Sequence, residues 1–426
     1  MKMNLDKSHK LFQRAKNVIP GQSQTFSKGP TQFVGSISPH YCNRAKGANI
    51  WDVDENQYVD YMMALGPIIL GYCDDEVDEA VIEQVKKGSI FSLSHKIEVE
   101  CAEKISALIP SAEMVRFGKN GSDVTTAAVR ISRAYTGKDK VACCGYHGWQ
   151  DWYIGSTTRN KGVPNETQRL TLPFKYNNID SLRALFDQHP NKIACVIIEA
   201  IGLEEPDKNF LNEVKALAHK NNAILIFDEM KTGCRLALGG VEEYTGVTPD
   251  LSTWGKAVAN GYPLSFISGK KELMEEIDNT FFSFTFGGEA VSMAACVKTL
   301  ELIQKRQTIS HIDQLGQSLK LQFDQCIKHH QLEKYIENKG LSTHFVTVFN
   351  GTSEFKGIEL KSLLHQELVK RQQLTIGSYM LCGAHSSSHI SNFIKQLDDS
   401  LKVVSTAIAN GRVVESIEGK PVEVIF

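Results

Sequence analysis

The sequence lacks the features that mark membrane-spanning and nucleic-acid-binding proteins. No apolar run approaches the roughly 20 residues needed to cross a bilayer. The charged first residues also lack the apolar core of a signal peptide. The formal net charge is −2 and lysine and arginine are spread along the chain, which leaves no basic stripe for nucleic acid. The composition predicts a soluble, cytoplasmic protein with no membrane and no nucleic-acid partner.

The cysteines form neither a disulfide framework nor a metal-binding pattern. Ten are scattered along the chain, no C-x-x-C pair occurs, and the adjacent Cys143 and Cys144 cannot hold a structural zinc ion alone. Several lie inside apolar runs, where a free cysteine behaves as a small hydrophobic residue. His147 has no second ligand at metal-binding spacing. We therefore predict reduced thiols and no metal.

The chain does contain an alternation of helical and strand patterns, from about residue 97 to residue 300. Such alternation is typical of a mostly parallel α/β sheet. We predict an α/β protein with a large domain over 71–305, and a smaller α/β lobe built from an N-terminal segment, 1–70, and a C-terminal domain, 306–426. The expected helices span 5–18, 98–109, 122–135, 210–221, 291–304, 309–330, 359–372 and 390–409; the expected strands span 141–144, 193–198 and 223–227, with a hairpin over 48–60.

Two of the predicted strands end in a carboxylate. Asp228 follows the apolar run 223–227, and Glu199 follows 193–198 in the same way. Ligands of parallel sheets bind at the carboxyl ends of strands, so we expect these acids to share one site. Lys256 lies in a Gly-flanked turn of the same segment as Asp228, and the pair favours a cofactor with a basic ring nitrogen and a carbonyl group. The alternatives are two ordinary surface charges, or the paired carboxylates of a sugar hydrolase.

Glycine-bearing turns precede two of the predicted helices. Gly121 and Ser122 open the helix over 122–135, where free backbone N–H groups and the helix dipole favour a phosphate. The alternative is a simple N-cap by Ser122. The run 281–290 is a second candidate phosphate cap, ahead of the helix over 291–304.

Large aromatic residues crowd the turn after the strand 141–144. The stretch from Tyr146 to Tyr153 places them between glycines at the carboxyl edge of the sheet, where they can stack on a flat ring. The alternative is a cluster that only packs the loop. His147 is a candidate acid or base, and we expect it to act instead as a hydrogen-bonding group.

Together these segments resemble the class III, pyridoxal-phosphate-dependent aminotransferases of fold type I. The chain is most similar to the branch that contains glutamate-1-semialdehyde aminomutase, from Gly47-Ala48-Asn49-Ile50-Trp51-Asp52 to the C-terminal lobe. The order and spacing of the motifs, more than any one of them, make the resemblance specific. It implies pyridoxal 5′-phosphate as the cofactor and a homodimer with shared active sites.

The resemblance also implies a role for each matching residue. Lys256 would hold the cofactor as a Schiff base and serve as general base, and Asp228 would pair with the pyridine nitrogen. Gly121, Ser122 and Asp123 match the phosphate turn, Tyr146 the aromatic that stacks on one ring face with His147 beside it, Met230 the residue on the other face, Glu199 an active-site glutamate near the cofactor, and Thr285 a threonine that reaches the phosphate of the neighbouring subunit.

Positions around the substrate depart from the aminomutase. Lys28 is the nearest cation where the aminomutase has a carboxylate-binding arginine, and lysine lacks the bidentate fork. Ala64 and Leu65 replace a serine and a tryptophan, and Glu289 stands where asparagine is usual. Arg235 and Arg412 are the remaining arginine candidates for a substrate carboxylate, although a structural role is expected for both.

We therefore expect an intermolecular aminotransferase that uses an amino-acid donor such as glutamate. The expected acceptor is a polar carbonyl compound, with a sugar of cell-surface polysaccharide biosynthesis as the candidate. Its pocket would be bordered by Glu289, Gln150, Asp151 and Trp152. Glutamate-1-semialdehyde 2,1-aminomutase is the alternative activity, and a binding protein that kept the fold but lost catalysis is the alternative from another class.

Overall fold

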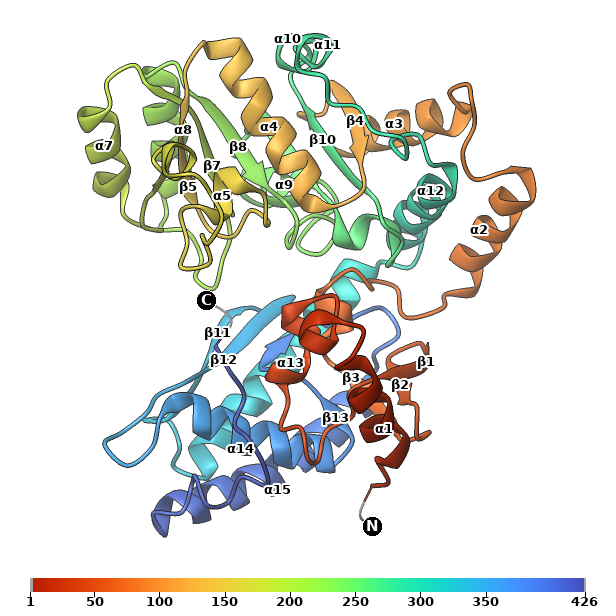
Figure 1. Cartoon of the computed structure of the whole chain (residues 1–426), viewed down its shortest axis with the longest axis vertical. Helices are drawn as coiled ribbons and strands as arrows, with labels where there is room; N and C mark the ends of the chain where they lie inside the picture. Colours follow the sequence, from red (N-terminus) through yellow and green to blue (C-terminus); the bar gives the residue numbers. More distant parts are fainter. Residues whose placement is uncertain (1–2, 425–426) are drawn as a thin grey trace. The chain divides into compact units, whose positions relative to one another are not determined.

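A computed structural model describes residues 3–424 of the chain. Contacts within the chain divide it into two units, which Figure 1 shows coloured by sequence. One unit comprises Asp75–Ile309. The other combines the segment that ends at Asp74 with the segment that begins at Ser310. Two distant parts of the sequence thus fold together in the second unit.

A seven-stranded sheet forms the centre of the Asp75–Ile309 unit. Its strand order is β4-β10-β9-β8-β7-β5-β6. β10 is antiparallel to β4 and β9, and the other pairs are parallel. The predicted α/β class with a mostly parallel sheet is therefore confirmed. The strands are β4 (Met114–Gly118), β5 (Lys140–Cys144), β6 (Thr171–Pro173), β7 (Ile193–Ile198), β8 (Ile224–Asp228), β9 (Leu251–Trp254) and β10 (Ser265–Gly269).

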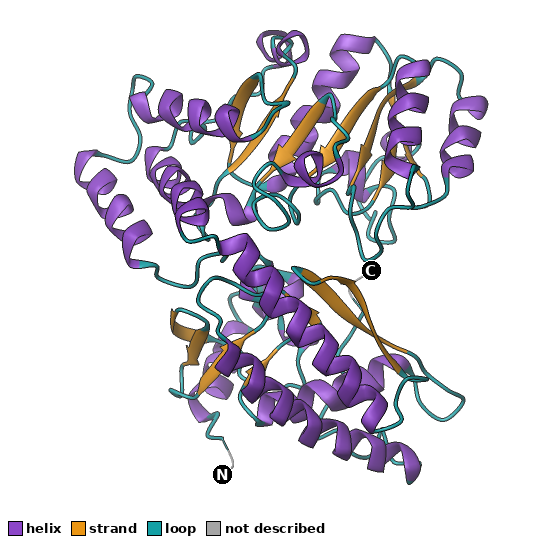
Figure 2. Ribbon diagram, turned by 180° about the vertical axis from the view of Figure 1, so that it is seen from behind, coloured by secondary structure: helices purple, strands orange, loops and turns teal. Residues whose placement is uncertain are grey.

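Helices flank this sheet, as Figure 2 shows. Every residue of β7 and β8 is buried, because strands that are covered on both faces carry apolar side chains in both directions. α4 packs against β7, β9 and β10, and α8 packs against β8. The helices are α2 (Asp75–Lys87), α3 (Lys96–Leu108), α4 (Gly121–Thr136), α5 (Asp151–Ile154), α6 (Asn165–Gln168), α7 (Ile179–Gln188), α8 (Phe210–Lys220), α9 (Gly240–Thr245), the 3₁₀ turn η5 (Lys256–Ala259), α10 (Lys271–Met274), α11 (Ile277–Thr280) and α12 (Ala290–Lys305).

The second unit contains two small sheets. In one, the strand order is β1-β2-β3-β13, and β13 pairs in parallel with β3, so that Gln373 lies opposite Val59. The other sheet has the order β11-β12-β14. The elements are α1 (Asp6–Ala15), β1 (Cys42–Lys46), β2 (Asn49–Asp52), β3 (Gln57–Asp60), α13 (Thr308–His329), β11 (Ile336–Leu341), β12 (His344–Phe349), α14 (Gly357–Lys370), β13 (Gln373–Leu374), β14 (Ser378–Tyr379) and α15 (Ser387–Ala409), with short 3₁₀ turns at Pro20–Gln22, Phe26–Lys28, Pro30–Gln32 and Met63–Leu65.

The helices and strands expected from sequence periodicity are present with small shifts at their ends. The strand predicted over 193–198 is β7, the helix over 210–221 is α8, and the hairpin over 48–60 is formed by β2 and β3. Helix ends shift because capping contacts, which periodicity does not encode, decide the last turn. Across residues 3–424, no helix has the length and apolar character to cross a membrane.

Candidate active site

Glu199 and Asp228 lie at the same edge of the large sheet. β7 and β8 are adjacent and parallel, and Ile198 lies opposite Phe227. Asp228 is the last residue of β8, while Glu199 directly follows β7. The residues that end the two strands are therefore neighbours, and the expectation that both acids come to one sheet edge is confirmed.

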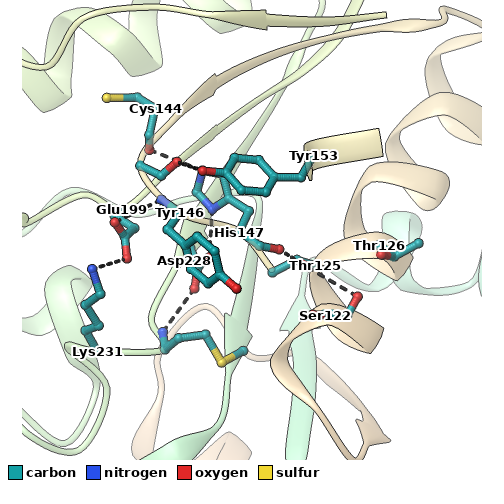
Figure 3. Close-up of polar contacts among 12 residues, drawn as sticks. Ser122, Thr125, Thr126, Cys144, Tyr146, His147, Tyr153, Glu199, Asp228 and Lys231 are labelled. Atoms are coloured by element: carbon teal, nitrogen blue, oxygen red, sulfur yellow. Dashed lines mark hydrogen bonds and ion pairs between the residues drawn. The ribbon is translucent and has the colours of Figure 1, made fainter. Parts of the chain in front are cut away.

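The Asp228 carboxylate is buried and held by two partners. His147 Nδ1 lies 2.7 Å from its Oδ2 atom, and the Met230 N–H donates to its Oδ1 atom over 3.1 Å. We assign the hydrogen to Nδ1, because an ionised carboxylate can only accept. The Nε2 atom of the same ring lies 3.2 Å from the Cys144 carbonyl oxygen. Figure 3 shows the ring and the carboxylate facing each other. His147 thus fixes the orientation of Asp228.

The glycine-bearing turn predicted to bind phosphate is the N-terminus of α4. Asp123 Oδ2 accepts the backbone N–H groups of Asn120, at 2.7 Å, and of Lys119, at 3.2 Å. Its carboxylate therefore shapes the turn, as a capping residue does. Ser122 Oγ accepts the Trp149 N–H at 3.3 Å, which joins the turn to the aromatic loop. The first N–H groups of a helix have no intrahelical acceptor and can serve an anion.

The aromatic loop divides into exposed and buried rings. Tyr146 is 44% exposed and Trp149 is 67% exposed. Trp152 and Tyr153 are buried; Trp152 Nε1 donates to Thr126 Oγ1 at 3.0 Å, and the Tyr153 hydroxyl donates to the Gly145 carbonyl at 2.8 Å. The expected placement of Trp152 at the border of a substrate pocket is therefore wrong, because its ring packs the core.

Lys256 follows β9 and opens the 3₁₀ turn η5, with a left-handed φ of 50°. Burial, the largest cause, lowers the pKa of its amine to about 8, and the nearby Lys231 ammonium adds to the lowering. Glu199 and Asp228 act in the opposite direction. Within residues 3–424, no hydrogen bond or ion pair engages the Lys256 amine. The amine is therefore poised for covalent chemistry near neutral pH.

Met230 connects the helix turn to the lysine turn. A Cβ atom on Gly121 would come 2.9 Å from Met230 Sδ, and one on Gly255 would come 2.8 Å from the same atom. Real Cβ atoms do not approach other atoms this closely, so a side chain at either glycine would displace the Met230 thioether. In this way the Met230 residue has Asp228, the start of α4 and the turn of Lys256 around it.

Lys231 belongs to this group and was missed by the sequence analysis. Its Nζ atom lies 2.7 Å from Glu199 Oε1, and the Tyr146 N–H donates to Glu199 Oε2 at 3.1 Å. Burial acts to raise the pKa of Glu199, but Lys231 outweighs it with the help of His147 and the Tyr146 N–H, and the pKa is lowered. The available signal was a cation in the turn that directly follows Asp228.

Thr285 lies apart from these residues, whereas Glu289, in the same run 281–290, contacts the α4 turn through Lys119. Thr285 is exposed, and no contact recorded among residues 3–424 joins it to Lys256 or Asp228. Glu289 Oε1 accepts the Val291 N–H at 2.7 Å at the start of α12, and Glu289 Oε2 pairs with Lys119 Nζ at 2.7 Å. The expectation of a second phosphate cap here is wrong, because a carboxylate already occupies that helix end. The same two contacts hold Glu289 away from a role as a pocket border.

The two arginines considered for a substrate carboxylate have other surroundings. Arg235 is almost fully buried, and its charge is among those that lower the pKa of Lys256. Arg412 lies on the surface of the other unit, 3.6 Å from Glu415. Neither offers an exposed guanidinium beside the Asp228 carboxylate.

One group elsewhere could hold a metal ion. In the part of the chain that the structure describes, His329, His330 and Asp398 place their ligand atoms within 4.8 Å of one another. His330 Nε2 already lies 2.9 Å from Asp398 Oδ1. The sequence analysis did not single out these residues, because α13 and α15 bring them together from distant positions.

Comparison with known proteins identifies the family. Residues 34–367 match the family described as aminotransferase class-III. The chain belongs to this family. A 3-aminobutyryl-CoA aminotransferase of Cloacimonas acidaminovorans is 38% identical over 352 residues, which are 81% of this chain and 82% of that protein. A glutamate-1-semialdehyde 2,1-aminomutase of Acetivibrio thermocellus is 39% identical over 339 residues, covering 74% and 78%.

A solved structure supports the same assignment. The FumI protein of Sphingopyxis sp. MTA144, in its pyridoxal phosphate (PLP) internal aldimine form, aligns with a TM-score of 0.89 at 26% identity, over 98% of this chain and 99% of that chain. The predictions of fold type I and of pyridoxal 5′-phosphate as cofactor are confirmed. The site of this class-III enzyme fits that cofactor, since it presents an amine without a partner, an anchored carboxylate and a helix N-terminus.

Glu229, which follows Asp228, supports the turn that carries Lys231. Its Oε1 atom accepts the Val241 N–H at 2.8 Å, and its Oε2 atom accepts the Thr232 hydroxyl. Burial is the largest cause that raises the pKa of this carboxyl, to about 8. Glu229 is therefore protonated in the folded enzyme at neutral pH, although it would be ionised in the unfolded chain.

We predict that Glu229→Gln changes how stability depends on pH. The folded-state pKa is raised, so the unfolded chain releases this proton first, and the wild type loses stability as pH rises from about 4.5 towards 8. The glutamine of the variant does not titrate, so the variant does not lose stability in this way. Its free energy of unfolding relative to that of the wild type should therefore rise across this pH window by an amount of the order of a few kcal/mol. Melting temperatures at pH 5, 6.5 and 8 measure the effect. Parallel curves for the two proteins would contradict it.

Proposed function

We propose that this chain is an intermolecular aminotransferase that takes an amino group from an amino-acid donor, glutamate being the expected one. The acceptor is a polar carbonyl compound, and a sugar of cell-surface polysaccharide biosynthesis is the candidate. The observation that carries the proposal is the amine of Lys256, which has a pKa near 8 and no partner among residues 3–424, beside a carboxylate anchored by His147.

Each residue of the site has a task in this proposal. Bound pyridoxal phosphate supplies an electron sink for the carbanion that forms at the amino-bearing carbon. Asp228 holds a proton on the ring nitrogen by ion pairing, and His147 keeps the carboxylate in position. Lys256 Nζ would hold the cofactor and would serve as the base that takes up and returns the proton, which suits an amine whose pKa lies near the working pH.

The remaining contacts orient the cofactor. The backbone N–H groups of Gly121 and Ser122 receive the phosphate at the positive end of α4. Tyr146 would pack against one face of the cofactor ring and Met230 against the other. The Asp123 carboxylate caps the turn at the start of α4. Asp123 would therefore support phosphate binding by holding the backbone of this turn in place.

The choice between transferase and mutase rests on the residues around the substrate. Lys28 stands where the aminomutase uses arginine, and it lines a cavity of about 180 Å³ within the smaller unit, together with Tyr41, Tyr72 and Ala64. A lysine binds a carboxylate as a point charge without the bidentate fork. This difference supports amino transfer between two substrates, the transferase reaction, more than rearrangement within one substrate, the mutase reaction. The curated aminomutases among the relatives, such as that of Acetivibrio thermocellus, keep the mutase as the second candidate.

We further propose a homodimer with shared sites. Ile90, Phe91 and Leu93 are exposed apolar residues, and they line one groove together with Phe284 and Thr285. Exposed apolar surface of this kind usually marks an interface. A second copy of the chain is the proposed occupant, because Thr285 lies in this groove and has no recorded contact with the described site residues of its own chain.

We predict that Lys256→Ala abolishes turnover and covalent attachment of pyridoxal phosphate, because Nζ is the atom that would form the bond. Borohydride reduction followed by mass spectrometry should add the cofactor mass to the wild type and nothing to the variant. Lys161→Ala, which removes an exposed lysine of the same unit, should match the wild type in both assays. A Lys256→Ala enzyme with normal turnover would overturn the proposed function.

The proposed donor is tested with glutamate alone. We predict that the PLP-loaded wild type forms about one equivalent of 2-oxoglutarate per site when no acceptor is present. A panel of keto sugars, 3-oxo acyl compounds and glutamate-1-semialdehyde then identifies the acceptor by amination. Absence of 2-oxoglutarate, together with rearrangement of the semialdehyde, would establish the aminomutase instead.

Shared sites predict that two defective chains restore each other. Thr285→Val should weaken cofactor binding, and Lys256→Ala should be inactive, but a mixed dimer contains one site with both native residues. Co-expression with two affinity tags, followed by double purification, should recover about half the activity per site that the wild type shows. If Thr285 serves its own subunit, the mixed dimer has no native site, and its activity does not exceed the residual activity of Thr285→Val.

A further inference from the structure

Lys231 and Glu199 form an ion pair beside the lysine that is proposed to bind the cofactor. Lys231 lies in the turn after β8, and its Nζ atom is 2.7 Å from Glu199 Oε1. Figure 3 shows this pair next to Tyr146, His147 and Asp228. The Lys231 side chain is 31% exposed and that of Glu199 is 12% exposed, so the pair faces the site and is only partly screened by water.

The Glu199 carboxylate lies close against the loop after β5. A Cβ atom on Gly145 would come 2.7 Å from both the Cγ and the Oε2 atoms of Glu199, and the Tyr146 N–H donates to the Oε2 atom at 3.1 Å. The ion pair is also close to the lysine turn, because Lys231 follows Met230, whose Sδ atom lies against Gly255, the residue before Lys256. The negative charge of Glu199 would therefore attract an ammonium group on Lys256.

We propose that Lys231 is a positioning residue that, directly and through Glu199, favours the uncharged and reactive form of the Lys256 amine over the ammonium form. The proposal rests on the proposed function, because it takes Lys256 to be the reacting lysine. Lys231 acts in two ways with the same sign. Its positive charge repels a second ammonium group, and it neutralises the carboxylate that would otherwise stabilise one.

The charges around Lys256 support this assignment. Burial favours the uncharged amine, and Lys231 is the charged group with the largest effect; Arg235 acts in the same direction. Glu199, at the end of β7, and Asp228, at the end of β8, favour the ammonium form. Of these two carboxylates, Glu199 is the one that pairs with Lys231, whereas Asp228 has His147 as its side-chain partner.

Lys231 is also the member of this group that can be replaced with least damage. Arg235 is almost fully buried, and its removal would leave a cavity in the core. The Lys231 side chain reaches partly into solvent, and its one recorded ion pair is with Glu199. A methionine at this position keeps most of the unbranched chain and removes the ammonium group.

The test measures the reactivity of the Lys256 amine in the full chain freed of pyridoxal phosphate. Acetic anhydride labels uncharged amines, and peptide mass spectrometry gives the rate at Lys256 from pH 6 to pH 10. The wild type should show a half-point near pH 8. Lys231→Met should raise the half-point by about one pH unit, which lowers the labelling rate at pH 7 about tenfold. Lys231→Arg should stay close to the wild type.

Glu199→Gln supplies the opposite change. It removes the attraction for an ammonium group and leaves Lys231, so the half-point should fall below that of the wild type. The double variant Lys231→Met with Glu199→Gln should return towards the wild-type value. A purely structural role would not move the two single variants in opposite directions. Thermal melts of each variant establish that the compared proteins are folded.

A matched control is available on the surface of α3. Lys96 Nζ lies 2.8 Å from Glu100 Oε1, and both side chains are exposed. Lys96→Met breaks an ion pair of the same type and should leave the labelling curve of Lys256 unchanged. In the loaded enzyme, the acid limb of the kcat/KM profile should move with the half-point in Lys231→Met and remain in place in Lys96→Met.

The outcomes separate this inference from the proposed function. An unchanged labelling curve in folded Lys231→Met would overturn the role of Lys231, even if the wild type transfers amino groups from glutamate. Shifts of the labelling half-point in the same direction in Lys231→Met and Glu199→Gln would overturn it as well, and so would any shift in Lys96→Met. Opposite shifts in an enzyme that fails the glutamate assay would support the electrostatic role of Lys231 and refute the donor.

Discussion

The buried carboxylate of Asp228 is the charge on which the rest of the site depends. Placing an ion in a protein interior costs of the order of several kcal/mol unless partners compensate it. His147 Nδ1, at 2.7 Å, and the Met230 N–H, at 3.1 Å, are those partners. They come from the loop after β5 and from the turn after β8. Satisfying one charge therefore holds two segments at the same sheet edge.

Close packing around Met230 completes the arrangement. Gly121 at the start of α4 and Gly255 before η5 both lie against its sulfur atom, with no room for a Cβ atom on either. The helix end suited to a phosphate and the turn that carries Lys256 thereby pack against the same side chain. Hydrogen bonding orients the carboxylate, and packing brings the two turns together.

Much of this could be predicted from the sequence because it depends on short stretches of chain. The apolar runs before Glu199 and Asp228 could only be buried strands, and adjacent parallel strands bring their ends together. Contacts between side chains that are distant in the sequence were harder to predict. Glu289 was expected to border a pocket, yet it caps α12 and pairs with Lys119. Trp152 was expected beside the substrate, yet its ring is buried and donates to Thr126.

The sequence by itself determined the fold class and the placement of Asp228 at a strand end and of Lys256 in a turn, which follow from local patterns of apolar and polar residues. The order of the motifs gave the resemblance to a family, and that resemblance implied the cofactor. Only the tertiary structure decided that Asp123 caps its own helix, that His147 holds Asp228, and that Lys231 balances Glu199. The physical reason is that an ion pair depends on distances of about 3 Å between side chains, and such distances are set by packing between segments that the sequence leaves far apart.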